Sequence, residues 1–478
     1  MKNPRQIVQN IEITDISTEG KGIGRINNIV AFIDHAIPGD VVDVEITKKK
    51  SNYREGKAIL FHKRSEKRTE ARCKHFGTCG GCKWQDMNYE SQLFFKNKYV
   101  VDALTRIGRL LPGPSPQGEG SKFLPIIPSK NIFNYRNKLE FTFSNKKWLT
   151  SDELALTLSA EPNSISHSGL GFHIPKLFDK VLDIEQCHLQ EEPSNAIRLE
   201  VKEYALANKL GFHDIRKREG FLRNLIIRNT SGGDWMVVVV FFYEDKAERE
   251  KMLNHLAKKF PQITSLQYVI NPKANDSIFD LEVKSFSGND FIEEVMEGLR
   301  FRIGPKSFFQ TNSLQAYELY KVAREFAELK GNETVYDLYT GTGTIANFVA
   351  RKAKKVVGIE YIPEAIEDAK INSELNAITN TEFFAGDIKD MLNENFVSEH
   401  GKPDVIITDP PRAGMHEDVA RKMLELAPEK IIYVSCNPAT QGRDISILSE
   451  KYRAEKIQPV DMFPHTAHVE SVVKLVRK

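Results

Sequence analysis

One cysteine near the C-terminus, Cys436, has a sequence context that suits a reactive thiol. Residues 430–434, just before it, read as a buried strand, and the Asn-Pro pair at 437–438 breaks that strand and begins a helix. Open α/β sheets place their ligands at the carboxyl ends of strands, where this thiol would lie. Cys436 is therefore a candidate nucleophile. A buried structural cysteine is the common alternative, and the local sequence does not decide between the two.

The four other cysteines form a second candidate site. Three of them lie close together, with glycines that let the backbone curl around a small object: Cys73, Cys79 and Cys82. In a cytosolic protein, thiolates at this spacing bind zinc or an iron–sulfur cluster far more often than they stay free. If Cys436 is the nucleophile, Cys187 is the cysteine that remains as a fourth ligand. His75 or His188 would be the alternative ligand of a zinc ion.

From about residue 330, strands and helices alternate regularly, which predicts a doubly wound parallel sheet. Seven strands are expected, at residues 335–339, 355–360, 381–386, 405–408, 431–435, 455–462 and 471–476. A glycine-containing loop follows the first strand at 337–344. Gly341 in this loop would let a ligand approach the backbone at a helix N-terminus, and Thr344 is a further candidate cofactor contact.

Acidic residues at the ends of the predicted strands suit an adenosine cofactor. Glu360 ends the second strand, where a carboxylate can accept hydrogen bonds from both ribose hydroxyls, and Asp387 ends the third, near the adenine amino group. Asp409, followed by two prolines, ends the fourth. The loop lacks the third glycine of dinucleotide sites, and several carboxylates fit the sulfonium of S-adenosylmethionine better than NAD. Gln310, ahead of the sheet, could bracket cofactor and base.

The N-terminal segment differs from the rest of the chain. A length of 478 residues predicts two or three domains. Residues 5–62 read as short strands divided by glycine and proline, which predicts a small OB-like β-barrel. Residues 45–72 contain ten lysines and arginines but only four glutamates. Such a basic run indicates RNA binding, while a solvated face or a barrel used only for protein contacts is the alternative.

Between these regions a helix is expected at 88–110, followed by a linker rich in proline and glycine at 111–121 and then by strands at 139–144 and 236–242. No apolar run is long enough to cross a bilayer, and no apolar segment follows the N-terminus as in a signal peptide. We therefore expect a cytoplasmic protein without a membrane partner, and a monomer by default.

Together these segments resemble the RNA uracil-5-methyltransferase family, specifically its 23S rRNA branch with a TRAM domain and an iron–sulfur cluster. The resemblance runs through nearly the whole chain. Besides the four clustered cysteines, it is carried by GKGIGR at 20–25, PGDVV at 38–42, FFQTN at 308–312, DLYTGTGT at 337–344, DPPR at 409–412, SCNPAT at 435–440 and DMFPHTAHVES at 461–471. The chain departs from the family at Thr340, where cysteine is frequent, and at Ile345, where an aromatic residue is usual.

The resemblance implies a multidomain α/β protein. A TRAM/OB-like RNA-binding barrel would occupy 1–62. A central α+β domain at 63–300 would carry the iron–sulfur site, with the helix at 88–110 able to pack on the catalytic domain. A C-terminal seven-stranded doubly wound methyltransferase sheet would occupy 301–478. The implied cofactors are S-adenosylmethionine and a structural [4Fe-4S] cluster, favoured over zinc, held by Cys73, Cys79, Cys82 and Cys187.

The resemblance also implies the reaction. Carbon 5 of uracil is too weak a nucleophile to take a methyl group, so Cys436 would first add to carbon 6, and Glu470 would remove the carbon 5 proton as general base. The cofactor contacts would be Gln310, Tyr339, Glu360, Asp387 and Asp409. The target uridine would be flipped out of ribosomal RNA. The alternatives are a tRNA uridine-5-methyltransferase, an exocyclic-amino methyltransferase, which needs no thiol, a non-catalytic RNA-binding protein, and a redox enzyme that uses the cluster.

Overall fold

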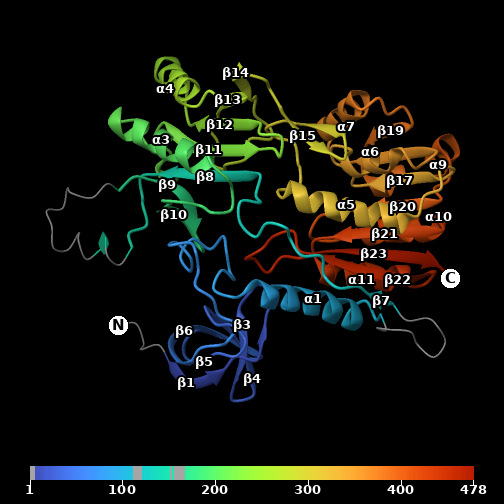
Figure 1. The fold of residues 1–478 in the computed structure, drawn as a ribbon, viewed down its shortest axis with the longest axis horizontal. Coiled ribbons are helices and arrows are strands. Elements are labelled where there is room, and N and C mark those ends of the chain that lie inside the picture. The colour runs from blue at the N-terminus through green and yellow to red at the C-terminus, as the bar shows by residue number, and fades with distance from the viewer. Residues whose placement is uncertain (1–5, 111–120, 151–152, 155–166) are drawn as a thin grey trace.

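The structure is a computed structural model that describes residues 6–110, 121–150, 153–154 and 167–478. Within these residues the strands form sheets of six, seven and eight strands and one two-stranded ribbon. In Figure 1 the six-stranded sheet lies at the bottom, the seven-stranded sheet at upper left and the eight-stranded sheet at right, so the protein is a multidomain α/β molecule. None of the described helices is long and apolar enough to span a bilayer.

The N-terminal sheet is built from short strands, as the sequence predicts. In pairing order they are β1 (Ile7–Glu12), β5 (Val41–Lys49), β6 (Tyr53–Lys63), β4 (Ile29–Asp34), β3 (Gly22–Ile26) and β2 (Asp15–Ile16). Alternate side chains point to one face, and Ile33, Val42 and Val44 are completely buried there. The run of short N-terminal strands that the sequence predicts is therefore confirmed.

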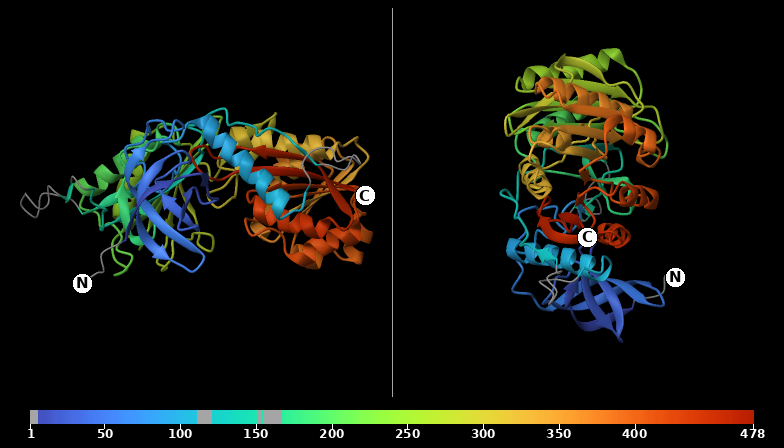
Figure 2. Two further views of the ribbon diagram at one scale, coloured as in Figure 1. Left: turned by 90° about the horizontal axis from the view of Figure 1, so that it is seen from below. Right: turned by 90° about the vertical axis from the view of Figure 1, so that its right-hand side faces the viewer.

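Helix α1 (Tyr89–Arg106) lies between this sheet and the C-terminal part of the chain (Figure 2). It begins at Asn88, whose side chain accepts a hydrogen bond from the backbone N–H of Ser91 at 2.9 Å, an N-cap that stabilises the first turn. Past its C-terminal end, Gly108 meets Gly442 so closely that a Cβ atom at Gly442 would stand 3.0 Å from the Gly108 nitrogen. The predicted linker that follows lies, up to residue 120, outside the described residues.

The central sheet consists, in pairing order, of β10 (Leu177–Asp183), β9 (Gly169–Ile174), β8 (Lys138–Ser144), β11 (Leu222–Asn229), β12 (Trp235–Phe241), β13 (Ser265–Ile270) and β14 (Lys284–Gly288). Helices α3 (Ser194–Ala207) and α4 (Lys246–Lys259) pack on one face. The other face contacts the ribbon of β15 (Ile292–Met296) and β16 (Leu299–Ile303). Because β12 is buried on both faces, its sequence is a continuous apolar run and not an alternating one.

The C-terminal sheet has eight strands, in the order β19 (Thr381–Ala385), β18 (Lys355–Glu360), β17 (Thr334–Leu338), β20 (Val405–Thr408), β21 (Lys430–Ser435), β23 (Glu470–Arg477), β22 (Tyr452–Val460) and β7 (Lys122–Phe123). The first five are parallel, and β23 runs antiparallel to both of its neighbours. The expected number of seven is wrong by one, because β7 comes from far upstream to pair with β22. A two-residue strand leaves no periodicity to detect.

Helices cover both faces of this sheet, which confirms the predicted doubly wound fold. Three pack on one face: α5 (Ser313–Ala327), α6 (Thr344–Ala350) and α7 (Pro363–Leu375). The other face carries α1 together with α8 (Ile388–Met391), α9 (Glu394–His400), α10 (Glu417–Leu426) and α11 (Pro438–Leu448). The carboxyl ends of the parallel strands therefore meet at one edge, where the first residue of β23 also lies.

Candidate active site

Cys436 and Glu470 stand at adjacent positions on two paired strands. Ser435 at the end of β21 pairs with Ser471 of β23, so the next position in the antiparallel register brings Cys436 level with Glu470. Cys436 is half-buried and is followed by Asn437, whose side chain caps α11 by accepting a hydrogen bond from the Ala439 N–H at 3.2 Å. The cap and the proline after it end the strand at the thiol.

The surroundings of Cys436 favour a neutral thiol in the free protein. Burial raises the pKa of this thiol to about 11, and the neighbouring Glu470 and Asp409 carboxyls act in the same direction. The exposed Arg412 acts in the opposite direction and lowers this pKa. The thiol therefore lies among ionisable groups, unlike a structural cysteine packed only by apolar side chains.

Two carboxyl groups at this edge have raised pKa values. Glu470 is 3% exposed, and burial raises its pKa well above the usual range, with the nearby Asp409 adding to the effect. Burial likewise raises the pKa of Asp409 to about 7, with a further contribution from Asp337. Closely spaced carboxyls with perturbed pKa values are typical of sites that bind a cation or transfer a proton.

The glycine loop after β17 is shaped by Asp337. Its Oδ2 atom accepts hydrogen bonds from the Thr340 hydroxyl at 2.6 Å and the Ala346 N–H at 3.0 Å, while Oδ1 is buried without a partner. Tyr339 and Gly341 both have positive φ, at 63° and 54°. A Cβ atom at Gly341 would meet nothing within 4 Å, so this backbone is open to a ligand. Thr344 begins α6 directly after the loop.

Glu360 and Asp387 follow on the next two strands. The carboxylate of Glu360 accepts hydrogen bonds from the backbone N–H groups of Gly341 at 3.2 Å and Ile362 at 3.1 Å, which fixes it beside the glycine loop. Asp387 caps α8 and forms an ion pair with Lys389 at 2.9 Å, and this hydrogen-bonded partner lowers the pKa of Asp387. Both residues thus lie at the same edge as Asp409.

Gln310 lies on the segment that joins β16 to α5. Its side chain is buried and its backbone carbonyl accepts a hydrogen bond from Asn137 at 2.9 Å, so the segment is held against the central sheet. Asn312 caps α5 and donates to the Met462 carbonyl at 3.0 Å. Phe308, by contrast, is 71% exposed. The segment therefore connects the central sheet to the C-terminal edge.

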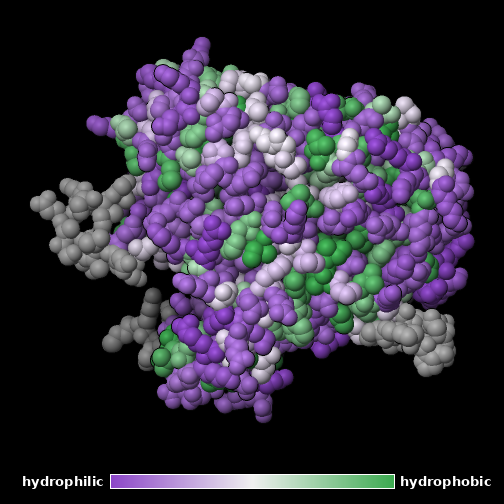
Figure 3. All heavy atoms as spheres, viewed as in Figure 1, coloured by the Kyte–Doolittle hydropathy of each residue, from purple (hydrophilic) through white to green (hydrophobic). Residues whose placement is uncertain are grey.

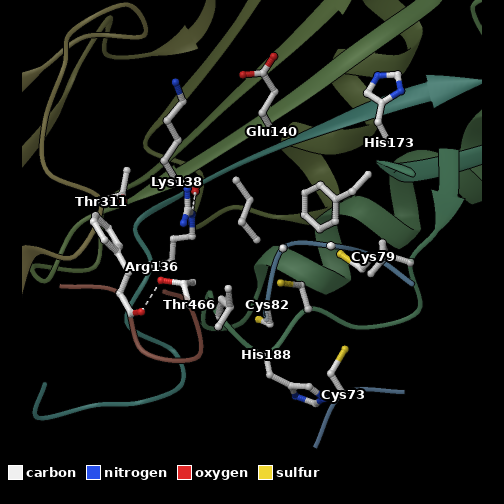
Figure 4. Close-up of a pocket in the computed structure, with 18 of the residues that line it drawn as sticks. Cys73, Cys79, Cys82, Arg136, Lys138, Glu140, His173, His188, Thr311 and Thr466 are labelled. Atoms are coloured by element: carbon white, nitrogen blue, oxygen red, sulfur yellow. Dashed lines mark hydrogen bonds between the residues drawn. The ribbon is translucent and has the colours of Figure 1, made fainter. Parts of the chain in front are cut away.

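The four clustered cysteines line a separate cavity of about 790 Å³ between the central sheet, the 308–311 segment and the loop that precedes Glu470. Figure 4 shows Cys73, Cys79 and Cys82 on one side of this cavity, opposite Arg136 and Lys138. Burial raises the pKa of the Cys79 thiol to about 11 and that of Cys82 to about 12. Among the described residues, no group of three or more His, Cys, Asp or Glu side chains lies close enough together to hold a metal ion. The sulfur atoms converge on one cavity without forming a closed site.

Basic residues line this cavity beside the cysteines: Arg136, Lys138 and Arg228. On the sequence alone, the basic segment around Arg136 could contact phosphate or equally form a surface edge, whereas Arg228 was not singled out. The surface seen in Figure 3 is mostly hydrophilic, and its hydrophobic side chains gather near the middle of the view, where the central and C-terminal sheets meet. The sequence signal that could have indicated the basic residues of the cavity is lysine or arginine combined with aromatic residues, because nucleic-acid sites combine the two.

Comparisons with known proteins show the family to which this chain is similar. A sequence model of the tRNA (uracil-5-)-methyltransferase family matches residues 236–478, and one of the TRAM domain matches residues 7–59. An RNA methyltransferase of Bacteroides thetaiotaomicron is 54% identical over 96% of this chain and 99% of its own length. One of Porphyromonas gingivalis is 54% identical over 98% of this chain and 99% of its own.

Among solved structures, the chain is similar to a tRNA (uracil-54, C5)-methyltransferase of Pyrococcus abyssi in complex with S-adenosyl-L-homocysteine. The TM-score is 0.74 at 28% sequence identity, over 97% of this chain and 99% of that one. Both the catalytic sheet and the N-terminal strands are thus included in the match. With its TRAM domain and its methyltransferase sheet, the chain belongs to the RNA uracil-5-methyltransferase family.

Proposed function

We propose that this protein transfers a methyl group from S-adenosylmethionine to carbon 5 of a uridine in RNA, through a covalent bond between Cys436 and carbon 6 of the uracil. The observation that carries the proposal is the placement of Cys436 beside Glu470 at the ends of β21 and β23. A thiol next to a carboxyl supplies the nucleophile and the base that this reaction needs. Methylation of an exocyclic amino group would leave both residues without a role.

Each residue has one role in the reaction. The Cys436 thiolate adds to carbon 6, and the electron pair of the carbon 5–carbon 6 double bond moves into an enolate. Carbon 5 then takes the methyl group of the sulfonium, which leaves as neutral S-adenosylhomocysteine. Glu470 accepts the carbon 5 proton while the carbon–sulfur bond breaks, which restores the thiolate and releases 5-methyluridine. Because a stacked uracil is out of reach, the nucleotide must first be flipped.

The electrostatics of the free site support an order of events. With a pKa of about 11, the Cys436 thiol is protonated at neutral pH, and raised pKa values keep the nearby carboxyls Glu470 and Asp409 from ionising readily. A cation bound beside Asp409 would favour the ionised form of all three groups, since an opposite charge stabilises a thiolate or carboxylate. Cofactor binding would therefore prepare both the nucleophile and the base.

The cofactor would be held along the carboxyl edge by the residues proposed from the sequence: Gln310, Tyr339, Gly341, Thr344, Glu360, Asp387 and Asp409. Glu360 should matter most, because its carboxylate is already fixed beside the open backbone of Gly341. We expect Glu360→Gln to weaken S-adenosylhomocysteine binding by roughly tenfold to 100-fold, the range for a charged hydrogen bond. Isothermal titration calorimetry measures this.

The matched control is Glu382→Gln on the neighbouring strand, where the carboxylate pairs with Lys355 and His400 away from the loop. It should bind the ligand like the wild type. Equal affinity of Glu360→Gln and wild type would remove Glu360 from the set of cofactor contacts.

We also propose that Cys73, Cys79, Cys82 and Cys187 hold a [4Fe-4S] cluster. The convergence of four thiols on one cavity supports it, and the cluster would cross-link the cysteine segment to the central sheet. Anaerobically purified protein should contain about four iron and four sulfide per chain and show broad visible absorption. Cys187→Ser should lose this absorption, whereas Cys436→Ala should keep it. Stoichiometric zinc without sulfide, or an unchanged cluster in Cys187→Ser, would contradict the assignment.

Ribosomal RNA is the substrate class that we propose. The resemblance to the branch with a TRAM domain and clustered cysteines supports it. Exposed basic side chains along β5, β6 and the residues between and after them would hold the phosphate backbone of either kind of RNA: Lys48, Lys49, Lys50, Lys57, Lys63, Arg64 and Arg72. The tRNA methyltransferase of similar structure keeps tRNA as the second candidate.

The decisive experiment offers both RNAs. Unmodified ribosomal RNA and unmodified tRNA are each incubated with the protein and methyl-labelled S-adenosylmethionine, digested, and separated into nucleosides. Label in 5-methyluridine from ribosomal RNA alone is the expected result. Label from tRNA alone would show that tRNA, not ribosomal RNA, is the substrate. Label in a methylated adenosine or cytidine would contradict the proposed reaction.

A further inference from the structure

The loop of residues 461–469 joins β22 to β23 and delivers the proposed base. Val460, the last residue of β22, pairs with Glu470, the first residue of β23, so the loop begins and ends directly beside Glu470. The same loop contributes Phe463, Thr466 and His468 to the wall of the cysteine-lined cavity. Its conformation therefore bears on both the base and the cavity.

The first residue of this loop is held by a buried cation from α1. The Lys96 ammonium donates to Asp461 Oδ1 at 2.5 Å and to the Phe463 carbonyl at 2.9 Å, and both charged side chains are 0% exposed. The Tyr89 hydroxyl, on the same face of α1 about two turns earlier, donates to Asp461 Oδ2 at 2.8 Å. Both carboxylate oxygens of Asp461 thus accept hydrogen bonds from side chains of α1. Lys96 and Asp461 are 365 residues apart in the sequence.

The middle of the loop is held by a second side chain of the same helix. Gln92 accepts a hydrogen bond from the His465 N–H at 2.8 Å, and its amide nitrogen lies 3.2 Å from His465 Nδ1. The His465 carbonyl accepts from the backbone N–H groups of Lys83 and Trp84, at 2.8 and 3.0 Å, in the segment just after Cys82. His465 has a φ of 65°, a conformation that needs such support.

Stability alone is a weak reason for this arrangement. A fully buried ion pair gains little over apolar side chains of the same size, because desolvation of both charges offsets their attraction. The contribution of the pair is positional. It fixes the carboxylate of Asp461 and therefore the end of β22, whose last residue pairs with Glu470. Lys98, two residues along, pairs instead with Asp15 and Asp102 away from the loop.

We propose that Tyr89, Gln92 and Lys96 of α1 are positioning residues for the base, holding the loop of residues 461–469 so that Glu470 meets the carbon 5 proton of the uracil adduct. This inference rests on the proposed function. Disturbing these residues should slow release of the methylated product more than formation of the covalent bond, because formation depends on Cys436 and the cofactor edge. Misplacement of a reacting group by about 1 Å can slow a step by on the order of 100-fold.

The test is a single-turnover experiment with the RNA that the wild type methylates. Labelled methyl is followed first into the covalent protein–RNA species, isolated after denaturation, and then into free RNA. The variants are Tyr89→Phe, which removes one hydroxyl, and Lys96→Met combined with Asp461→Asn, which leaves no lone buried charge. Lys98→Met is the matched control on the same helix. Thermal unfolding and S-adenosylhomocysteine binding confirm that each variant is folded.

We expect the adduct to form within about twofold of the wild-type rate in all variants, and to decay at least tenfold more slowly in the double variant, with a smaller delay in Tyr89→Phe and none in Lys98→Met. Unchanged decay, or equal loss of formation and decay, would overturn the positioning role. Failure of the proposed function looks different, because the wild type itself would then form no adduct or place its label outside 5-methyluridine.

Discussion

Cys436→Ala should form no covalent complex with RNA and should lose methyl transfer by at least about 10⁴-fold, as expected when a covalent nucleophile is removed. The reason lies in the substrate. Without addition at carbon 6, carbon 5 has no enolate character and does not attack the sulfonium. The measurement is a denaturing gel of protein with labelled RNA, together with the rate at which label enters 5-methyluridine.

Cofactor binding provides the internal control for this variant. Cys436 follows β21, whereas the proposed cofactor contacts Glu360 and Gly341 belong to β18 and the glycine loop. S-adenosylhomocysteine should therefore bind Cys436→Ala as it binds the wild type or slightly more tightly. Cys436→Ser, which keeps the shape of the side chain, should be almost equally inactive because a serine hydroxyl ionises far less readily than a thiol. Full activity of either variant would show that Cys436 is a structural cysteine and not the nucleophile.

Much of the fold was predictable because the C-terminal sheet follows strict rules. Parallel strands buried on both faces give continuous apolar runs, and the predicted strand at 355–360 coincides with β18. The eighth strand, β7, could not be predicted, since two residues carry no pattern and their partner lies far along the chain. Tertiary pairing alone defines it.

The residues of the candidate site were likewise predictable only in part. Side chains at the ends of predicted strands, such as Glu360 and Asp409, follow from position in the sheet, while Glu470 came from resemblance to a family and not from any local pattern. The contacts of Lys96 with Asp461 were invisible, because a lysine on an amphipathic helix ordinarily points to solvent. Hydrogen bonds across hundreds of residues depend on how whole sheets and helices pack.

Glu470→Gln should separate the two halves of the reaction. The amide has the same shape but cannot accept the carbon 5 proton, so the methylated adduct should accumulate on Cys436 and decay by roughly 10²- to 10⁴-fold more slowly, the usual contribution of a general base. The matched control is Glu455→Gln at the other end of the same hairpin, where the carboxylate pairs with Lys474. That variant should release product at the wild-type rate.

The pH dependence of adduct decay is a second, independent test of Glu470 as the general base. Burial and the neighbouring Asp409 raise the pKa of Glu470 well above its usual range, and only the ionised carboxylate can take the proton. Decay should therefore quicken as the pH rises. In Asp409→Asn, loss of the neighbouring carboxyl lowers the pKa of Glu470, so the same rise should occur at lower pH when cofactor is saturating. A decay rate that is independent of pH, or a methylated adduct absent from Glu470→Gln, would move the role of base to another group.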